Sequence, residues 1–226
     1  MPGNMNKIKN AHKGETCVLV ACGPSLDDVP MDFLKSHITF GVNRCYLKGV
    51  PKGQNPNPDN IVFSPRYYVA HELLVRCYIR DLYWLKCQEY FLYHRLANEI
   101  GGAIPLRYTD VPAGFYGEDP SRQIYHGRTV TNIALQIIYY MGLETVLIVG
   151  LDHTGDVHFH PAYERHRPLG FGIMKWDKEH VHIVDTAFQM CRDAYEADGR
   201  RIINLTPGSK CDVFEKQDLE LWLTHT

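Results

Sequence analysis

The sequence predicts an α/β protein with a mostly parallel sheet and helices on both faces. The apolar run from Cys17 to Ala21 is short and stops at Gly23-Pro24, as a buried strand stops at a turn. A second run, Thr145 to Gly150, is apolar throughout, as a strand covered on both faces requires. Helical patterns alternate with such runs, which is typical of parallel α/β winding.

In the first half of the chain, short strands alternate with loops and helices. We expect a helix at Met31–Ser36, a strand at Ile38–Val42, a proline- and glycine-rich surface loop at Lys48–Asn60, a third strand at Ile61–Ser64, a helix at His71–Leu85 and a strand at Tyr90–Tyr93.

The second half begins with a stretch without a clear period. Residues 101–127 are therefore expected to form an irregular insertion or lid. After it we expect a buried helix at Arg128–Gly142, a helix at His182–Asp198 closed by Gly199, a strand at Arg201–Asn204 and a terminal helix at Leu219–Leu223.

Composition favours one soluble domain over residues 1–226, since 45% of the residues are hydrophobic. The formal net charge of −2 gives no general attraction to nucleic acid or to an anionic membrane. No segment reaches the roughly 18 apolar residues that a membrane span needs. Seven scattered cysteines without a Cys-x-x-Cys pair predict reduced thiols in a cytoplasm. The oligomeric state is not predicted.

The turn at Gly23-Pro24-Ser25 is the first candidate site. Ser25 and Asp28 have the spacing of a helix cap, which would leave the backbone amides after Gly23 free to face a phosphate. The alternative is an ordinary strand-to-helix turn. Cys22 could act there as a nucleophile, although no neighbouring base is visible. Neither Gly-x-Gly-x-x-Gly nor a P-loop motif is present, so a dinucleotide dehydrogenase or a P-loop ATPase lacks its defining loop.

Polar residues also follow two other expected strands. Asn43 suits a base edge or a ribose hydroxyl, and Arg44 can fork onto a phosphate. A turn asparagine followed by a solvated arginine is an equal alternative. Asp152 lies just beyond the 145–150 strand, at the sheet edge where open α/β sheets bind ligands.

Histidines gather between residues 153 and 182. The pairs His158-x-His160 and His180-x-His182 could bracket zinc only on strands or loops, and no third ligand stands at a recognisable spacing, so scattered surface histidines are the default. His182 is expected to open a helix, where it could remove a proton near neutral pH.

An ordered set of short motifs runs from Thr16 to about Phe214. It comprises Gly23-Pro24-Ser25-Leu26, Gly41-Val42-Asn43-Arg44, Met141-Gly142, Val149-Gly150-Leu151-Asp152, His182 and Asn204 to Ser209. The set resembles one shared by the family 42 bacterial sialyltransferases, which modify lipooligosaccharide, and by the DUF115 proteins. The latter include flagellin-modifying Maf-type proteins and the archaeal 6-hydroxymethylpterin diphosphokinases.

This resemblance implies a GT-A-like, Rossmann-like fold that binds a cytidine nucleotide. The Gly-Pro-Ser turn and Asn43 would hold the nucleotide, the turn formed by Thr206, Pro207, Gly208 and Ser209 would contact its phosphate, and His182 would deprotonate the acceptor hydroxyl. His160 and Arg128, at or beside family positions, become candidates for stabilising the leaving phosphate.

The resulting hypothesis is a transferase that uses a nucleotide-activated donor, most simply a glycosyltransferase moving a sugar from a CMP-type donor to a hydroxyl of a small-molecule or glycan acceptor. No metal is required in this mechanism. A diphosphokinase that uses ATP and Mg²⁺ is the alternative, and Asp152 or Asp156 could then hold the ion. A non-catalytic nucleotide-binding protein is the third possibility.

Overall fold

The computed structural model describes residues 3–70, 73–111, 120, 122–155, 157–166 and 176–223. Its centre is an eight-stranded sheet in the order β10-β9-β8-β1-β2-β3-β4-β5, with parallel pairing throughout. The strands are β1 (Thr16–Val20), β2 (Ile38–Val42), β3 (Tyr67–Ala70), β4 (Glu89–Tyr93), β5 (Ile104–Leu106), β8 (Thr145–Val149), β9 (Arg201–Asn204) and β10 (Glu215–Lys216). A separate parallel pair is formed by β6 (Tyr108–Thr109) and β7 (Ile124–Tyr125).

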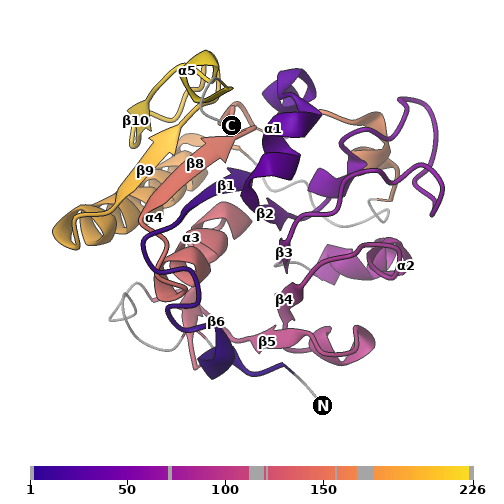
Figure 1. Cartoon of the computed structure of the whole chain (residues 1–226), viewed down its shortest axis with the longest axis horizontal. Coiled ribbons are helices and arrows are strands. Elements are labelled where there is room, and N and C mark those ends of the chain that lie inside the picture. The colour runs from indigo at the N-terminus through magenta and orange to yellow at the C-terminus, as the bar shows by residue number, and fades with distance from the viewer. Residues whose placement is uncertain are drawn as a thin grey trace.

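The order of the strands reverses direction at β1. From β1 the chain moves outward through β2 to β5, then returns to β8 on the other side of β1 and continues to β9 and β10. Because such crossovers are right-handed, the two halves place their helices on opposite faces. Figure 1 shows α1 (Met31–Ser36) and α2 (Ile79–Leu82) on one side, and α3 (Val130–Tyr140) and α4 (Lys178–Ala197) on the other. The carboxyl ends of β1 and β8 thus form a topological switch point.

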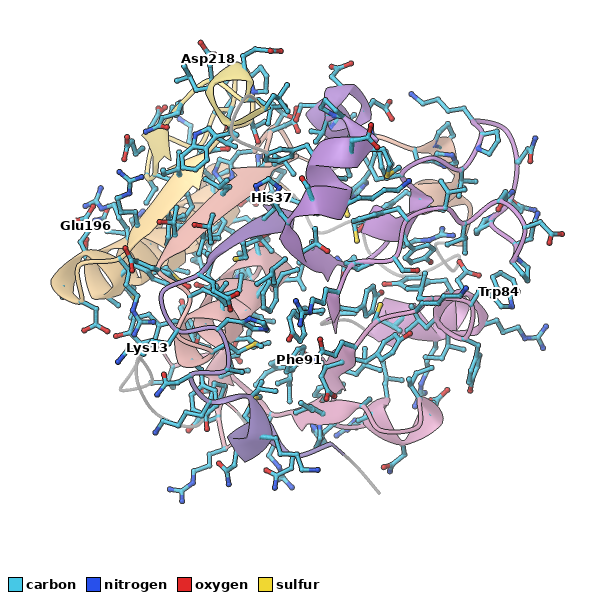
Figure 2. The ribbon with its side chains drawn as sticks, viewed as in Figure 1. Lys13, His37, Trp84, Phe91, Glu196 and Asp218 are labelled. Carbon is cyan, nitrogen blue, oxygen red and sulfur yellow. The ribbon has the colours of Figure 1, made fainter. Side chains whose placement is uncertain are left out.

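The core lies on both faces of the central strands. From Cys17 to Val20 every side chain of β1 is fully buried, and Val18 lies in register with Thr39 on β2 and Leu147 on β8. Figure 2 shows the opposite arrangement at the surface, where Lys13, Glu196 and Asp218 lie on the outside of the molecule. An unbroken apolar strand is therefore the expected pattern at the centre of this sheet.

Both long helices begin and end at residues with clear caps. The side chain of Thr129 accepts a hydrogen bond from the Thr131 amide at the start of α3, and Asp177 does the same for the His180 amide at the start of α4. Gly142 and Gly199 follow the two helices with φ of 84° and 71°, a left-handed geometry that glycine adopts most easily. The expected stops at these glycines are confirmed.

Two expected elements in the first half are wrong. Residues 61–64 are not a strand, and the third strand is β3, which follows Pro65 and consists of buried tyrosine, valine and alanine. The long helix expected from residue 71 is instead a 3₁₀ turn, Leu73–Cys77, and the single turn of α2. Tyr78 interrupts it with φ −133° and ψ 19°, and its ring packs 5.1 Å from the Arg44 guanidinium carbon. Residues 71 and 72 lie outside the described chain.

Other expected helices and strands agree more closely with the structure. The helix and strand expected at Met31–Ser36 and Ile38–Val42 have those bounds. The helix expected to open at His182 begins four residues earlier, at Lys178, because Asp177 is its cap. The terminal helix α5 spans Glu220–Leu223.

Residues 101–127 contain three short strands, so the part of this stretch that can be described is less irregular than expected. Strand β5 extends the main sheet beside β4, and β6 and β7 pair with each other. The remaining residues, 112–119 and 121, lie outside the described structure, and a role as a lid stays a prediction.

All seven cysteines are free thiols, as expected. In the described parts of the chain, no helix has both the length and the apolar character needed to cross a membrane.

Candidate functional site

A cavity of about 960 Å³ opens at the carboxyl edge of the sheet, beside the switch point. Its lining includes the residues that follow β1, β2 and β8, the 107–110 segment, the first turn of α3, and one face of α4. Ligand pockets in open α/β sheets lie at this position, and their volumes range from about 300 to 1,000 Å³. The cavity is thus the candidate site.

The turn after β1 is already occupied by a carboxylate from the same chain. Oδ1 of Asp152 accepts a hydrogen bond from the Ser25 amide at 3.1 Å, and Oδ2 accepts one from the Ser25 hydroxyl at 2.7 Å. The amide of Gly23 donates to the Gly150 carbonyl at 2.8 Å. The expectation of free amides facing an anion is therefore wrong, since Asp152 supplies the negative charge itself. The helical cap is also Gly23 and not Ser25, because the 3₁₀ turn starts at Pro24.

Gly23 is required by this arrangement, because a Cβ there would lie 2.1 Å from Oδ2 of Asp152 and 2.7 Å from the Gly150 carbonyl oxygen. Gly23 and Asp152 line the cavity, whereas Pro24 and Ser25 lie behind them. The turn therefore acts as a brace between the ends of β1 and β8.

Asn43 places a polar atom in the cavity wall. It follows β2 in a left-handed conformation, with φ 44°, and its amide donates to the Val69 carbonyl at 3.0 Å. Its Oδ1 atom is buried and has no hydrogen-bond partner among the described residues. Leaving a buried acceptor unpaired costs about 1–3 kcal/mol, so a ligand that donates a hydrogen bond here would recover that energy.

Arg44 is buried rather than solvated, with 1% of its surface exposed. Its Nη2 donates to Oδ2 of Asp81 at 3.2 Å and its Nε to the Tyr46 hydroxyl at 3.2 Å, while Nη1 donates to the Ala162 carbonyl. The interpretation of Arg44 as a solvated turn residue is therefore wrong. A phosphate contact by Arg44 stays a prediction and would require the guanidinium to leave these partners.

Cys22 also lines the cavity but is a poor nucleophile. Its Sγ donates to the Val42 carbonyl at 3.2 Å, and burial raises the pKa of the thiol to about 12. The thiol thus stays protonated near neutral pH.

The two histidines proposed for catalysis lie away from the cavity lining. His160 is buried, its Nε2 lies 3.0 Å from the Val50 carbonyl, and its Nδ1 accepts from the Ala162 amide at 3.1 Å. Both ring nitrogens of His160 are thus engaged in packing a loop. His182 is exposed on α4. Their catalytic roles stay predictions.

Two other histidines, His153 and His180, line the cavity, and the sequence predicted a catalytic role for neither of them. His180 is buried on the face of α4 that also carries Val184, Phe188, Cys191 and Tyr195. This face could have been found by extending the apolar period one turn backward, which reaches residue 180 and not residue 182.

Three arginines line the cavity, and the one at the start of α3, Arg128, has its Nη2 4.0 Å from Oε1 of Glu179 on α4. Arg128 precedes α3 with φ 56° and lines the cavity together with Arg107 and Arg122. Among the described lining residues the acidic ones are Asp110 and Asp152, and the carboxylate of Asp152 is held by Ser25. The described lining therefore holds more basic than acidic side chains, which favours an anionic ligand.

The search of solved structures agrees with this architecture. No protein-family model matches the chain, and a search of curated proteins gives no match. Among solved structures, the Maf glycosyltransferase from Magnetospirillum magneticum AMB-1 superposes with a TM-score of 0.57 at 12% sequence identity. The fold resembles that of a glycosyltransferase. The match covers 94% of this chain but 37% of the Maf protein, and at this identity it is a likeness of fold.

The Thr206–Ser209 turn lies outside the cavity lining and braces the loop after β8. Thr206 Oγ1 accepts from the Leu151 amide at 2.9 Å, and Ser209 Oγ donates to the Leu151 carbonyl at 2.6 Å. Pro207 and Gly208 are exposed. Contact of this turn with a phosphate stays a prediction. Binding of Mg²⁺ by Asp152 also stays a prediction, and the other expected ligand, Asp156, lies outside the described residues.

Proposed function

We propose that this chain is a transferase that binds a nucleotide-activated donor in the cavity and moves a sugar to an acceptor hydroxyl, with a CMP-type donor as the first candidate. The observation that carries the proposal is that Arg107, Arg122, Arg128 and the first turn of α3 all line one cavity at the switch point. Positive charge at this place suits the phosphate of an activated donor.

Two parts of the cavity lining suit the two parts of such a donor. The phosphate would lie near Arg128 and the first turn of α3, where the helix dipole also favours negative charge. The unpaired Oδ1 of Asn43 would accept a hydrogen bond from an amino group or hydroxyl of the nucleoside. The charge that develops on the leaving phosphate would be stabilised by the arginines without a metal ion.

For the general base we propose His180, because it lines the cavity and His182 does not. It would take the proton from the acceptor hydroxyl as that oxygen attacks the sugar carbon and the nucleotide leaves. Replacing His180 with Ala should lower turnover by about 10²–10⁴-fold while leaving nucleotide affinity within about 3-fold of the original. His182→Ala is the matched comparison. If only His182→Ala lowers turnover, the base is His182 and the assignment to His180 is wrong.

Calorimetry against CMP, UDP and ATP, each with and without Mg²⁺, tests the class of ligand. Metal-free binding of CMP would support the transferase. Mg²⁺-dependent binding of ATP alone would favour the diphosphokinase, and binding of none of them would overturn both. Release of CMP from an activated sugar in the presence of acceptor would then separate an enzyme from a binding protein.

The arginines give this experiment a matched pair of variants. Arg128→Ala should weaken nucleotide binding by about 10–100-fold, the equivalent of a lost charge-assisted hydrogen bond. Arg201→Ala is the control, because Arg201 is an exposed residue at the opposite, amino-terminal end of β9. Equal loss in the two variants would point to a general charge effect and against a phosphate site at α3.

A further inference from the structure

Three metal-binding residue types meet beside the cavity, and none of them has a role in the proposed transfer reaction. His153 lies in the loop after β8, Asp185 on α4, and Cys211 in the turn after β9. One ligand atom from each lies within 4.8 Å of those of the other two. These segments are far apart in the sequence, so the cluster is a product of the fold.

The imidazole and the carboxylate of the cluster lie against each other as a pair. Nε2 of His153 and Oδ1 of Asp185 form a buried contact of 2.9 Å, and neither atom has a further hydrogen-bond partner among the described residues. The His153 side chain is 4% exposed. A buried imidazole nitrogen and carboxylate oxygen that have only each other as partners, with a thiol sulfur within 4.8 Å, can turn their lone pairs onto one cation.

The third member supplies sulfur. Cys211 is fully buried, which raises the pKa of its thiol, while hydrogen bonds from the backbone of Val213 and Phe214 act in the opposite direction. Backbone donors aimed at a sulfur stabilise a thiolate once a metal ion replaces the proton. On binding, the Cys211 S–H bond would break, the proton would pass to solvent, and a sulfur–metal bond would form.

We propose that His153, Asp185 and Cys211 form a site for one borderline-soft divalent cation, Zn²⁺. Imidazole nitrogen, carboxylate oxygen and thiolate sulfur are the ligands that zinc binds in proteins, and thiolate disfavours Mg²⁺ and Ca²⁺. Zinc lies about 2.0–2.3 Å from such ligands, which separates the ligand atoms by roughly 3.5 Å in a tetrahedron. That separation lies above the 2.9 Å of the His153–Asp185 pair and below the 4.8 Å within which all three ligand atoms lie. Solvent takes the fourth position.

The cation can reach this site from solvent, and its binding would join three segments of the chain. Asp185 is 40% exposed, so the cation can enter from the outer side of α4. Once bound, it ties the loop after β8 to α4 and to the turn after β9. His153 also touches Trp176, with ring centroids 5.0 Å apart, and both line the cavity. The ion therefore stabilises one wall of the cavity and takes no part in the chemistry.

The test is zinc affinity, measured on the full chain by competition with a chromophoric chelator after removal of metal. We expect one Zn²⁺ per chain, and Cys211→Ser should weaken it by about 100-fold or more. The control is Cys77→Ser, a half-buried cysteine on the 3₁₀ turn before α2, which should keep the affinity of the original chain. Equal affinity of the original chain and Cys211→Ser would overturn the proposal.

Two further measurements control for misfolding of Cys211→Ser and for non-specific zinc binding. Asp185→Asn changes a part-exposed residue on α4 and should weaken Zn²⁺ by about 10-fold or more even if Cys211→Ser fails to fold. Replacing zinc with Co²⁺ should produce a thiolate-to-cobalt charge-transfer band that disappears in Cys211→Ser. A Co²⁺ complex without that band, or unchanged affinity in Asp185→Asn, would overturn the site. Neither readout depends on nucleotide binding, so the zinc site and the proposed function can fail separately.

Discussion

Removal of the Asp81 carboxylate should show that Arg44 is a buried structural cation. Asp81 lies on the single turn of α2 and accepts hydrogen bonds from Nη2 of Arg44 at 3.2 Å and from the Tyr46 hydroxyl at 2.7 Å. Its side chain is 11% exposed and that of Arg44 is 1% exposed. Asp81→Ala therefore leaves a guanidinium in the interior without its counter-charge, while alanine is well tolerated in a helix.

The expected loss in the free energy of unfolding follows from the loss of the counter-charge of Arg44. Breaking a buried ion pair by removing one partner destabilises a protein by about 3–5 kcal/mol, because the remaining charge is desolvated and unpaired. In a chain of this length, each kcal/mol lowers the melting temperature by about 2–4 °C, so the shift should be about 6–20 °C. The exposed pair of Asp27 and Lys52 provides the control, since Asp27→Ala should cost about 1 kcal/mol or less.

Urea unfolding of a double-mutant cycle measures this effect. Arg44→Met removes the charge that Asp81 balances, so adding Asp81→Ala to it should cost at least about 1 kcal/mol less than Asp81→Ala in the original chain. If Asp81→Ala alone costs no more than Asp27→Ala, Arg44 is hydrated and the buried-pair reasoning is refuted. Additive costs of the two changes would refute the coupling in particular.

Two other predictions concern the brace and the buried histidine. Gly23→Ala should destabilise the protein by about 1–3 kcal/mol, because its Cβ meets the Asp152 carboxylate, whereas Gly101→Ala, with nothing within 4 Å of its Cβ, should not. Urea unfolding compares them, and equal stabilities would contradict the clash. Burial lowers the pKa of His160 below its ordinary value of 6.5, so the unfolded chain takes up that proton first in acid. Its contribution to stability is complete above pH 6.5 and is lost as the pH falls toward the folded-state pKa. Thermal melts should show a smaller acid loss in His160→Gln, and an unchanged pH profile would rule out this account.

The amino-acid sequence by itself determined most of the sheet. Unbroken apolar runs identified β1 and β8, because strands covered on both faces must be apolar along their whole length. Glycine stops after α3 and α4 were also local signals, since the left-handed turn that ends a helix depends on the residue type. Strand β3 escaped detection because its buried tyrosines did not form the alternating pattern of a half-exposed strand.

The tertiary structure alone decided which of the candidate site residues meet, and with what partners. The sequence located the end of β1 and the end of β8 correctly, but it could not show that Asp152 reaches 127 positions back to hold the Ser25 turn. It left Arg44 between two interpretations, and only the packing of Asp81 and Tyr46 around it removed the solvated one. The physical reason is that burial, pairing and charge balance depend on neighbours that are distant in sequence. The apolar runs that revealed the strands, and the glycines that ended the helices, depend on neighbours along the chain.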